Sequence, residues 1–360
     1  MAMVPSSRIK VAVLGATGMV GQRFVELLSD HPWFEMTVLA ASERSAGRRY
    51  EDACHWGTSM RMPDEARDMV VKPCVPDLPA RVVFSALPTS VAGPVEEAFA
   101  EEGYAVFSNA SAHRMDSDVP LLIPEVNPSH LAMLRAQKMA RGWTEDHRGF
   151  IVTNPNCSTA ILTLALKPIH ESFGLKKVLV TTMQALSGAG YPGVSGLDVL
   201  DNVIPYIGNE EDKLVAEPRK ILGEWNAEAG HLAPADIVVS AACNRVATRD
   251  GHLESVSVSL EHEASPRDVM TAMQGFTALP QRLGCPTAPV PPILVTEKID
   301  RPQPRLDREA GGGMAVVVGR VRRCPVLGIK FMVLGHNTFR GAAAASILNA
   351  ELAVAQGVIG

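Results

Sequence analysis

The chain has 360 residues, of which 46% are hydrophobic and 20% are charged, and its formal net charge is −5. This composition is typical of a soluble globular protein, and the length exceeds what one ordinary hydrophobic core organises, so we expect two domains. The negative charge balance and the lack of a basic run with interleaved aromatic residues argue against a general nucleic-acid binder. Uninterrupted apolar runs stay well below about 18 residues, and residues 1–10 lack the apolar core of a signal peptide, so we expect neither a membrane span nor export.

Six cysteines are scattered along the chain without a C-x-x-C pair: Cys54, Cys74, Cys157, Cys243, Cys285 and Cys324. Without an export signal, this spacing indicates reduced thiols, and we expect neither a disulfide framework nor a zinc site. A cytoplasmic enzyme without a bound metal is therefore the default hypothesis.

Residues 8–14 form a short apolar run that is typical of a strand buried in a parallel sheet. A glycine turn follows over residues 15–21, and residues 22–28 have helical spacing. Strand, glycine turn and helix in this order form the phosphate-binding start of a dinucleotide fold. The spacing G-x-x-G-x-x-G differs from the strict G-x-G-x-x-G, so the motif takes its weight from its place directly after a buried strand.

Further strands are predicted over residues 36–41, 81–87 and 104–109, and residues 92–100 have the spacing of a helix. This alternation predicts a parallel sheet. Residues 129–149 are polar and are predicted to be irregular, with residues 141–149 forming a surface excursion.

The segment after residue 41 bears on the choice of cofactor. An NAD site usually places an acidic side chain here to bind the ribose 2′-hydroxyl. In this chain Ser42, Arg44 and Ser45 surround Glu43, and hydroxyls with an arginine suit a 2′-phosphate better. The segment therefore predicts a preference for NADP, which Glu43 weakens.

Beyond residue 157 the hydrophobic pattern changes. Residues 177–183 and 253–260 alternate in the manner of strands with one exposed face, which predicts an α+β domain with a mostly antiparallel sheet. The Pro-rich residues 285–304 are predicted to be loop and edge material, and residues 338–352 to form a helix after an Asn-Thr start.

Cys157 follows a Pro-Asn turn and opens an apolar helical segment. The positive end of a helix dipole and the free N–H groups of a first turn favour thiolate over thiol, and can also hold an oxyanion. The alternative is that Cys157 is a small buried hydrophobic residue, which is the usual fate of a free cysteine. We predict a nucleophile because of what surrounds it in the sequence.

Four other segments carry potential chemistry. Arg114 lies just past a strand end, residues 184–190 form a glycine-rich loop, residues 209–213 are a charge cluster, and Arg245 and His252 lie seven residues apart next to a strand. Each has an ordinary structural interpretation on its own, such as a solvated helix face for the charges. Their joint occurrence in this order favours a functional site.

Together these segments resemble the aspartate-β-semialdehyde dehydrogenase family, in the form found in archaea, fungi and some bacteria. The matching segments span nearly the whole chain in the family's order: GATGMVGQRF (15–24), ASERSAGRRY (41–50), SNASAHR (108–114), NPNCSTA (154–160), QALSGAGYPG (184–193), NEEDK (209–213), NRVATRDGHLESV (244–256) and GHNTFRGAAAASILNAE (335–351). Glu43 departs from the serine expected in the second segment.

The resemblance implies NADPH-dependent reductive dephosphorylation of L-aspartyl-4-phosphate to L-aspartate-4-semialdehyde and phosphate, a step toward lysine, threonine and methionine. Cys157 would form a thioester, His252 would be the acid/base, and Gln184 would orient His252 or the intermediate. Arg245 would bind the substrate α-carboxylate, and Glu210, or its neighbour Glu211, the α-ammonium. The phosphate would be held by Arg114, Lys213 and Asn156.

The resemblance also implies a Rossmann-like NADP-binding domain over residues 1–153, completed by a C-terminal helix (338–360). A catalytic and dimerisation domain over residues 154–337 would complete a glyceraldehyde-3-phosphate dehydrogenase-like fold, and the chain would form a homodimer or homotetramer. The expected NADP contacts are Gly15, Thr17, Gly18, Met19, Val20, Ser42, Arg44, Ser45, Ser85, Thr89, Asn109, Gly188 and Asn337.

Three alternatives remain open. An N-acetyl-glutamyl-phosphate reductase shares the chemistry, but a glycine would be expected where this chain has Asn156. A malonyl- or succinyl-CoA reductase would share the cysteine segment, and Glu210 would be idle because the substrate lacks an α-ammonium. A non-enzymatic dinucleotide sensor would keep the glycine turn without needing Cys157, Gln184 and His252 together.

Overall fold

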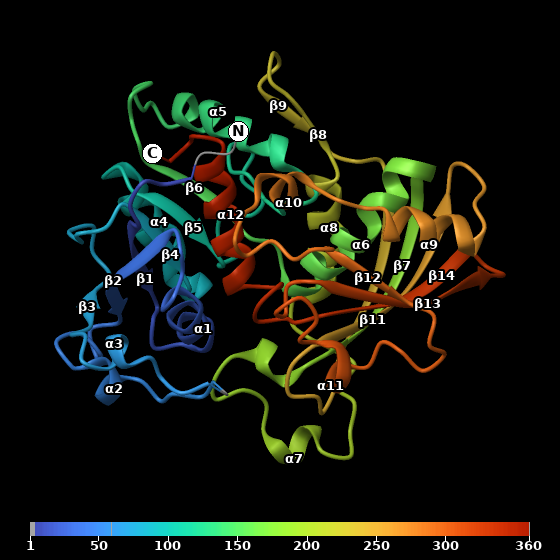
Figure 1. The fold of residues 1–360 in the computed structure, drawn as a ribbon, viewed down its shortest axis with the longest axis horizontal. Coiled ribbons are helices and arrows are strands. Elements are labelled where there is room, and N and C mark those ends of the chain that lie inside the picture. Colours follow the sequence, from blue (N-terminus) through green and yellow to red (C-terminus); the bar gives the residue numbers. More distant parts are fainter. Residues whose placement is uncertain (1–3, 59, 360) are drawn as a thin grey trace.

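The computed structural model describes residues 4–58 and 60–359, so residues 1–3 of the N-terminal segment considered above lie outside the described residues. Two six-stranded sheets organise the chain, and Figure 1 shows them side by side. The first contains the N-terminal strands, drawn in blue to green, and the second contains strands from the C-terminal half. The predicted α/β fold class is confirmed.

The first sheet has the strand order β3-β2-β1-β4-β5-β6, and every pairing in it is parallel. This is the predicted dinucleotide-binding arrangement, with β1 at the centre between β2 and β4. The elements of this half are β1 (Ile9–Leu14), α1 (Met19–Leu28), β2 (Phe34–Ala41), α2 (Tyr50–Ala53), α3 (Asp64–Arg67), β3 (Lys72–Pro73), β4 (Val82–Ser85), α4 (Thr89–Glu101), β5 (Ala105–Ser108), η1 (Pro128–Ala132), α5 (Met133–Ala140) and β6 (Phe150–Thr153).

The turn between β1 and α1 requires glycine at two places. Gly15 has a φ of +73°, and a Cβ there would lie 2.6 Å from the carbonyl oxygen of Ala86. A Cβ on Gly21 would lie 2.2 Å from the carbonyl oxygen of Gly15. The helix therefore packs closely on the strand end, which is the role that glycines have in dinucleotide-binding turns.

The second sheet has the order β10-β7-β11-β14-β13-β12. Its three central pairings are antiparallel and its two outer pairings are parallel, so the sheet is mixed and mostly antiparallel. The elements of this half are α6 (Cys157–Phe173), β7 (Leu175–Gln184), η2 (Leu186–Ala189), α7 (Gly196–Val199), α8 (Glu210–Ile221), β8 (Glu224–Asn226), β9 (His231–Ala233), β10 (Val238–Arg245), β11 (His252–Leu260), α9 (Pro266–Gln274), α10 (Leu279–Leu283), β12 (Ile293–Thr296), α11 (Pro304–Asp307), β13 (Val316–Cys324), β14 (Gly328–Gly335) and α12 (Ala343–Ala355).

The two faces of the second sheet differ. α6 packs against β7, β11, β13 and β14 on one face, where the strand side chains form a continuous apolar core. The other face leaves apolar side chains in solvent, since Leu179 of β7 is 48% exposed and Val238 of β10 is 62% exposed.

The interpretation of residues 129–149 as irregular was wrong over its first half. Residues 128–140 form η1 and α5, with Met133 and Leu134 buried in the core. Gln137 is fully buried as well, because its amide exchanges hydrogen bonds with the backbone of Ile151 on β6. A buried glutamine interrupts the apolar stripe, and the helical pattern was therefore missed.

The C-terminal helix also begins later than predicted. α12 starts at Ala343, because residues 336–342 form hydrogen-bonded turns, including Gly341 N–H to His336 O (3.1 Å). All thirteen residues of α12 are buried, and the helix packs on α1 and β5. Figure 1 shows this red helix among the blue and teal elements of the first sheet.

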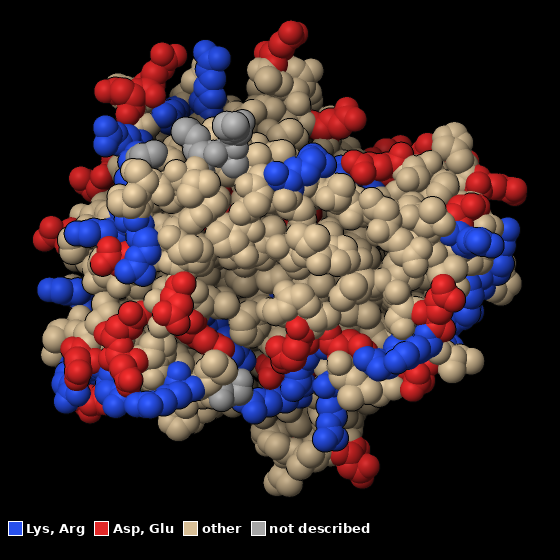
Figure 2. Space-filling model, viewed as in Figure 1, with Lys and Arg blue, Asp and Glu red and all other residues tan. Residues whose placement is uncertain are grey.

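Charged side chains of both signs lie around the rim of the face seen in Figure 2, and a largely uncharged band crosses its middle. The visible face thus carries no surface of a single sign. Among the helices of residues 4–58 and 60–359, none combines the length and the hydrophobicity needed to cross a membrane.

Candidate active site

Three of the predicted residues meet at one edge of the second sheet. β7 and β10 run parallel, and their last residues, Gln184 and Arg245, are register partners. β11 runs antiparallel to β7 and begins at the same edge with His252. The N-terminus of α6 brings Cys157 to this edge, so residues distant in sequence converge there.

A cavity of about 560 Å³ lies over this edge and extends to the first sheet. It is lined by residues from both halves of the chain: Met19, Val20, Leu87, Pro88, Thr89, Asn109, Ala110, Ser111, Arg114, Asn156, Cys157, Ser187, Gly188, Ala189, Gly190, Ile207, Gly208, Glu210, Lys213, Arg245, Asn337, Thr338, Gly341 and Ala342. Twelve of these residues were predicted as site residues.

Cys157 is the first residue of α6, and the turn before it is capped. Asn156 accepts the N–H groups of Ser158 and Thr159 on its side-chain oxygen, at 2.9 and 3.2 Å. The Cys157 Sγ lies 3.1 Å from Nε2 of His252. The predicted helix start and the cysteine–histidine contact are thus both present.

The orientation of His252 comes from the backbone. Its Nδ1 accepts the N–H of Ala185 at 3.0 Å, so the ring hydrogen lies on Nε2 and points at the sulfur. Gln184 was predicted to orient His252 or the intermediate, and the described residues show no hydrogen bond from its side chain to His252. The Gln184 amide donates to the Thr182 hydroxyl at 3.3 Å. Gln184 is only 1% exposed and is not one of the residues that line the cavity.

The electrostatics around the pair favour neutral groups. Burial, with a contribution from the Glu210 carboxylate, raises the pKa of Cys157 to about 12, although Arg245, Arg114 and the Ser158 amide oppose this. Burial, and then the nearby Arg245 and His336, lower the pKa of His252 to about 3. Desolvation thus outweighs the helix-terminus effect, and the expected resting thiolate is replaced by a thiol beside a neutral imidazole.

This neutral pair predicts a particular pH dependence of alkylation. Iodoacetamide reacts with thiolate, and a thiol whose pKa is raised gains thiolate tenfold per pH unit until the pKa is reached. The rate of Cys157 modification in the free protein should therefore rise steadily from about pH 6 to about pH 9, measured by peptide mass spectrometry. A rate that is flat across this range would mean that a thiolate–imidazolium pair exists in the free protein, and would contradict the neutral state inferred for Cys157 and His252.

Two glycines make room for the reacting groups. A Cβ on Gly188 would lie 3.0 Å from an Arg245 nitrogen and 3.2 Å from Cε1 of His252. A Cβ on Gly341 would lie 2.5 Å from Cβ of Cys157. Gly188 thus lies beside the Cys157–His252 pair and lines the cavity, and Gly341 is a further lining residue that was not singled out from the sequence, although it lies in a matching segment.

The charged groups face the cavity from α8 and β10. Arg245 is 6% exposed, and one guanidinium nitrogen donates to the Ala185 carbonyl at 2.7 Å. Glu210 accepts from the Asn156 amide at 2.7 Å and from Lys213 at 3.2 Å. Glu211 instead accepts the N–H of Cys243 at 3.0 Å, so of the two adjacent glutamates it is Glu210 that lines the cavity.

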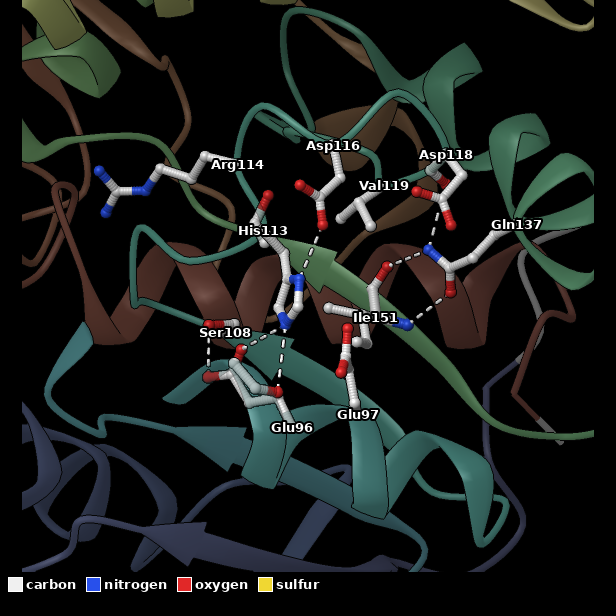
Figure 3. A network of polar contacts seen from close by, with 12 residues as sticks. Glu96, Glu97, Ser108, His113, Arg114, Asp116, Asp118, Val119, Gln137 and Ile151 are labelled. Carbon is white, nitrogen blue, oxygen red and sulfur yellow. Dashed lines mark hydrogen bonds and ion pairs between the residues drawn. The ribbon is translucent and has the colours of Figure 1, made fainter. Parts of the chain in front are cut away.

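Arg114 reaches the cavity from the loop after β5. Its guanidinium donates to Glu217 at 3.0 Å and to the Asn109 carbonyl at 2.8 Å. Figure 3 shows it pointing away from its neighbour His113, which faces Asp116 and Glu96.

Ser85, which was predicted as an NADP contact, lies outside the cavity lining. It is fully buried, and its hydroxyl donates to the Glu96 carboxylate at 2.6 Å, beside a matching 2.7 Å bond from Ser108. Glu96 therefore joins the ends of β4 and β5 through these two serine hydroxyls.

At the first sheet the cavity has the features of a dinucleotide site. Met19 and Val20 line it from the first turn of α1, which has no acidic residue and no side-chain cap. The amide N–H groups of this turn are therefore available to an anion, next to the turn that contains Gly15, Thr17 and Gly18. The residues present fit a dinucleotide, with its pyrophosphate at this helix end.

The remaining predicted contacts fall into two groups. Thr89, Asn109 and Asn337 line the cavity, and Asn337 holds two loops together by bonding Gly251 N–H and the Ser187 hydroxyl at 2.8 Å each. Ser42 and Arg44 are exposed just beyond β2, while Ser45 is 9% exposed and closes the turn onto Ser42.

A parallel dinucleotide-binding sheet and a histidine-paired cysteine that border one cavity define a cysteine-dependent dehydrogenase. Two family models agree with this class. Residues 10–134 match the semialdehyde dehydrogenase NAD binding domain, and residues 166–340 match the semialdehyde dehydrogenase dimerisation domain.

Relatives identify the particular family. The aspartate-semialdehyde dehydrogenase of Archaeoglobus fulgidus is 52% identical over 353 residues, which cover 98% of this chain and 100% of that protein. The enzyme of Saccharomyces cerevisiae is 46% identical over 358 residues, covering 96% and 98%. The chain belongs to the aspartate-semialdehyde dehydrogenase family.

Solved structures agree. The crystal structure of aspartate semialdehyde dehydrogenase with NADP from Candida albicans superposes with a TM-score of 0.90 at 45% identity, covering 98% of this chain and 100% of that one. Aspartate semialdehyde dehydrogenase II of Vibrio cholerae, complexed with ASA, gives a TM-score of 0.76 at 28% identity, covering 97% and 99%.

Proposed function

We propose that this protein catalyses the reductive dephosphorylation of L-aspartyl-4-phosphate to L-aspartate-4-semialdehyde and phosphate with NADPH, in the biosynthesis of lysine, threonine and methionine. The observation that carries the proposal is the 3.1 Å contact of His252 with Cys157, which lines a cavity together with Arg245 and Glu210. A nucleophile, a proton-carrying ring and a pair of opposite charges suit an acyl derivative of an α-amino acid.

In the first step the Cys157 sulfur bonds to the acyl carbon and the bond from that carbon to the phosphate oxygen breaks. The thiol proton leaves with the phosphate, and a thioester remains on Cys157. The Nε2–H of His252 stabilises the carbonyl oxygen as its charge develops, because the Asn156 cap already takes the N–H groups of Ser158 and Thr159. His252 can take up a proton at Nδ1 only if its bond from Ala185 opens.

NADPH, when bound, supplies the hydride that reduces the thioester carbonyl. Cys157 then releases the aldehyde as its carbon–sulfur bond breaks, and the sulfur regains a proton from solvent. His252 holds the departing sulfur through Nε2, the ring nitrogen that faces it.

The charged residues divide the substrate between them in this proposal. The guanidinium of Arg245 binds the α-carboxylate through paired N–H groups, and Glu210 binds the α-ammonium. Arg114 and Lys213 bind the phosphate. Asn156 gives one amide N–H to Glu210, which leaves the second for the phosphate.

NADP preference follows from the loop after β2. Arg44 is exposed there, free to pair with a 2′-phosphate, and a charge-assisted contact is worth about 1.5–3 kcal/mol. Arg44→Ala should therefore raise the KM for NADP by about tenfold to a hundredfold while the KM for NAD stays unchanged. Arg267→Ala, an exposed arginine on α9, is the control. Equal effects on both cofactors would reject the role of Arg44.

Phosphate dependence tests the proposed reaction. With aspartate semialdehyde, phosphate and NADP, absorbance at the NADPH band should rise only when all three are present. A rate that is independent of phosphate would reject an acyl-phosphate product.

Three further features stay proposals. We propose that residues 1–153 and 338–360 form the NADP-binding domain and residues 154–337 the catalytic domain, which the packing of α12 on α1 and β5 supports. We propose that the exposed face of the second sheet pairs with a second copy of the chain, supported by exposed Leu179 and Val238. A cytoplasmic location and a possible tetramer stay predictions from the sequence.

A further inference from the structure

One face of α8 carries four charged residues at helical spacing: Glu210, Lys213, Glu217 and Lys220. The first two line the cavity, and the proposed function uses both. The other two lie deeper, 2% and 5% exposed, and outside the cavity lining. Buried charges are costly unless they are paired, so the contacts of this second pair identify their task.

Glu217 joins two segments that the proposed chemistry needs together. One carboxylate oxygen accepts from the Arg114 guanidinium at 3.0 Å, and the other accepts the backbone N–H of Asn156 at 2.7 Å. Arg114 belongs to the loop after β5 in the first sheet, and Asn156 directly precedes Cys157. A single side chain thus links the arginine of the phosphate site to the turn of the nucleophile.

Lys220, one turn further along α8, fixes the same loop. Its ammonium donates to the carbonyls of Arg114, Asp116 and Val119 at 2.7, 2.7 and 2.9 Å, which uses all three of its hydrogens. The backbone on both sides of the Arg114 side chain is therefore held by the helix that carries Glu217.

We infer that Glu217 is a positioning residue that fixes the Arg114 guanidinium relative to Cys157. In this arrangement Arg114 binds the phosphate of the substrate while the Cys157 sulfur faces its acyl carbon. The inference rests on the proposed function. Glu217 touches neither the cavity nor the sulfur, and acts through Arg114 and the turn at Asn156.

The chemistry of the contact requires a carboxylate. Both partners are N–H donors, and a glutamine offers one acceptor oxygen and one NH₂ group, which would meet a donor. Glu217→Gln therefore loses one of the two bonds and leaves Arg114 without its counter-charge. Glu217→Asp keeps the charge and both acceptors on a side chain shorter by one carbon, so it should retain part of the function.

The test measures the KM for phosphate, for aspartate semialdehyde and for NADP in the oxidative direction. Glu217→Gln should raise the KM for phosphate at least about tenfold and lower kcat, with the KM for NADP within about twofold of wild type. Glu217→Asp should fall between the two proteins. Glu224→Gln, an exposed carboxylate on β8, is the control and should match wild type.

Coupling to Arg114 separates positioning from general destabilisation. In an Arg114→Ala background, Glu217→Gln should add little to the KM for phosphate, because the partner through which it acts is gone. Full additivity, or a phosphate KM for Glu217→Gln and Glu217→Asp equal to that of the control, would overturn the inference. A wild-type protein without phosphate-dependent activity would instead reject the proposed function, so the two failures are distinguishable.

Discussion

Cys157→Ser should reduce turnover by about 10⁴-fold or more, because a serine hydroxyl at this position is a far weaker nucleophile and forms no thioester. The substitution changes one atom, so the protein should fold and bind NADP as before. Turnover is measured with aspartate semialdehyde, phosphate and NADP.

The other cysteines provide matched controls. Cys243 is buried on β10 and Cys74 is half-buried near the end of β2, and neither lines the cavity. Serine at either position should leave kcat within a few-fold of wild type, as should serine at the three remaining cysteines. Complete inactivation by iodoacetamide without modification of Cys157 would show that the nucleophile is another residue.

Arg245→Lys should lower kcat/KM for aspartate semialdehyde by about tenfold to a hundredfold. Lysine keeps the charge but lacks the planar fork that can bind a carboxylate and the Ala185 carbonyl together. The KM for NADP should not change, because Arg245 ends a strand of the second sheet, whereas the glycine turn belongs to the first sheet. Arg249→Lys is the control, since Arg249 lies in the loop that follows Arg245 and its side chain is 63% exposed. Equal losses in both variants would mean that Arg245 has no particular role in substrate binding.

Local chain features account for what the sequence predicted well. The strand, glycine turn and helix of residues 9–28 depend on neighbouring residues, and so does the start of α6 at Cys157 after its Asn156 cap. The family resemblance, which rests on the order of the matching segments, then allowed Arg245 and His252 to be predicted as site residues. Such patterns are visible in a sequence because their partners lie within a few residues.

Contacts between distant residues account for what was missed. The buried Gln137 hid the helical pattern of α5, because its partner Ile151 lies on a strand that comes later in the chain. The choice between Glu210 and Glu211 depended on which residue faces β10. Glu217 was not singled out from the sequence, because its partners lie 61 and 103 residues away.

The pKa of Cys157 shows a similar limit. A helix N-terminus favours thiolate, and the sequence shows that part of the environment. Desolvation by the surrounding fold acts in the opposite direction and is the larger effect in the free protein. The sequence alone does not reveal how deeply the sulfur is buried.

The measurement that tests the central claim most directly compares substrates. Arg245 and Glu210 present opposite charges to the cavity, which match the carboxylate and the ammonium of an α-amino acid. Aspartate semialdehyde with phosphate and NADP should therefore be oxidised with a kcat/KM at least about a hundredfold above that of succinate semialdehyde with phosphate, since a substrate without the ammonium loses the ion pair with Glu210. Malonyl-CoA with NADPH should not be reduced. If either competitor is turned over as well as the amino-acid substrate, the proposed reaction is wrong and an acyl-CoA reductase takes its place.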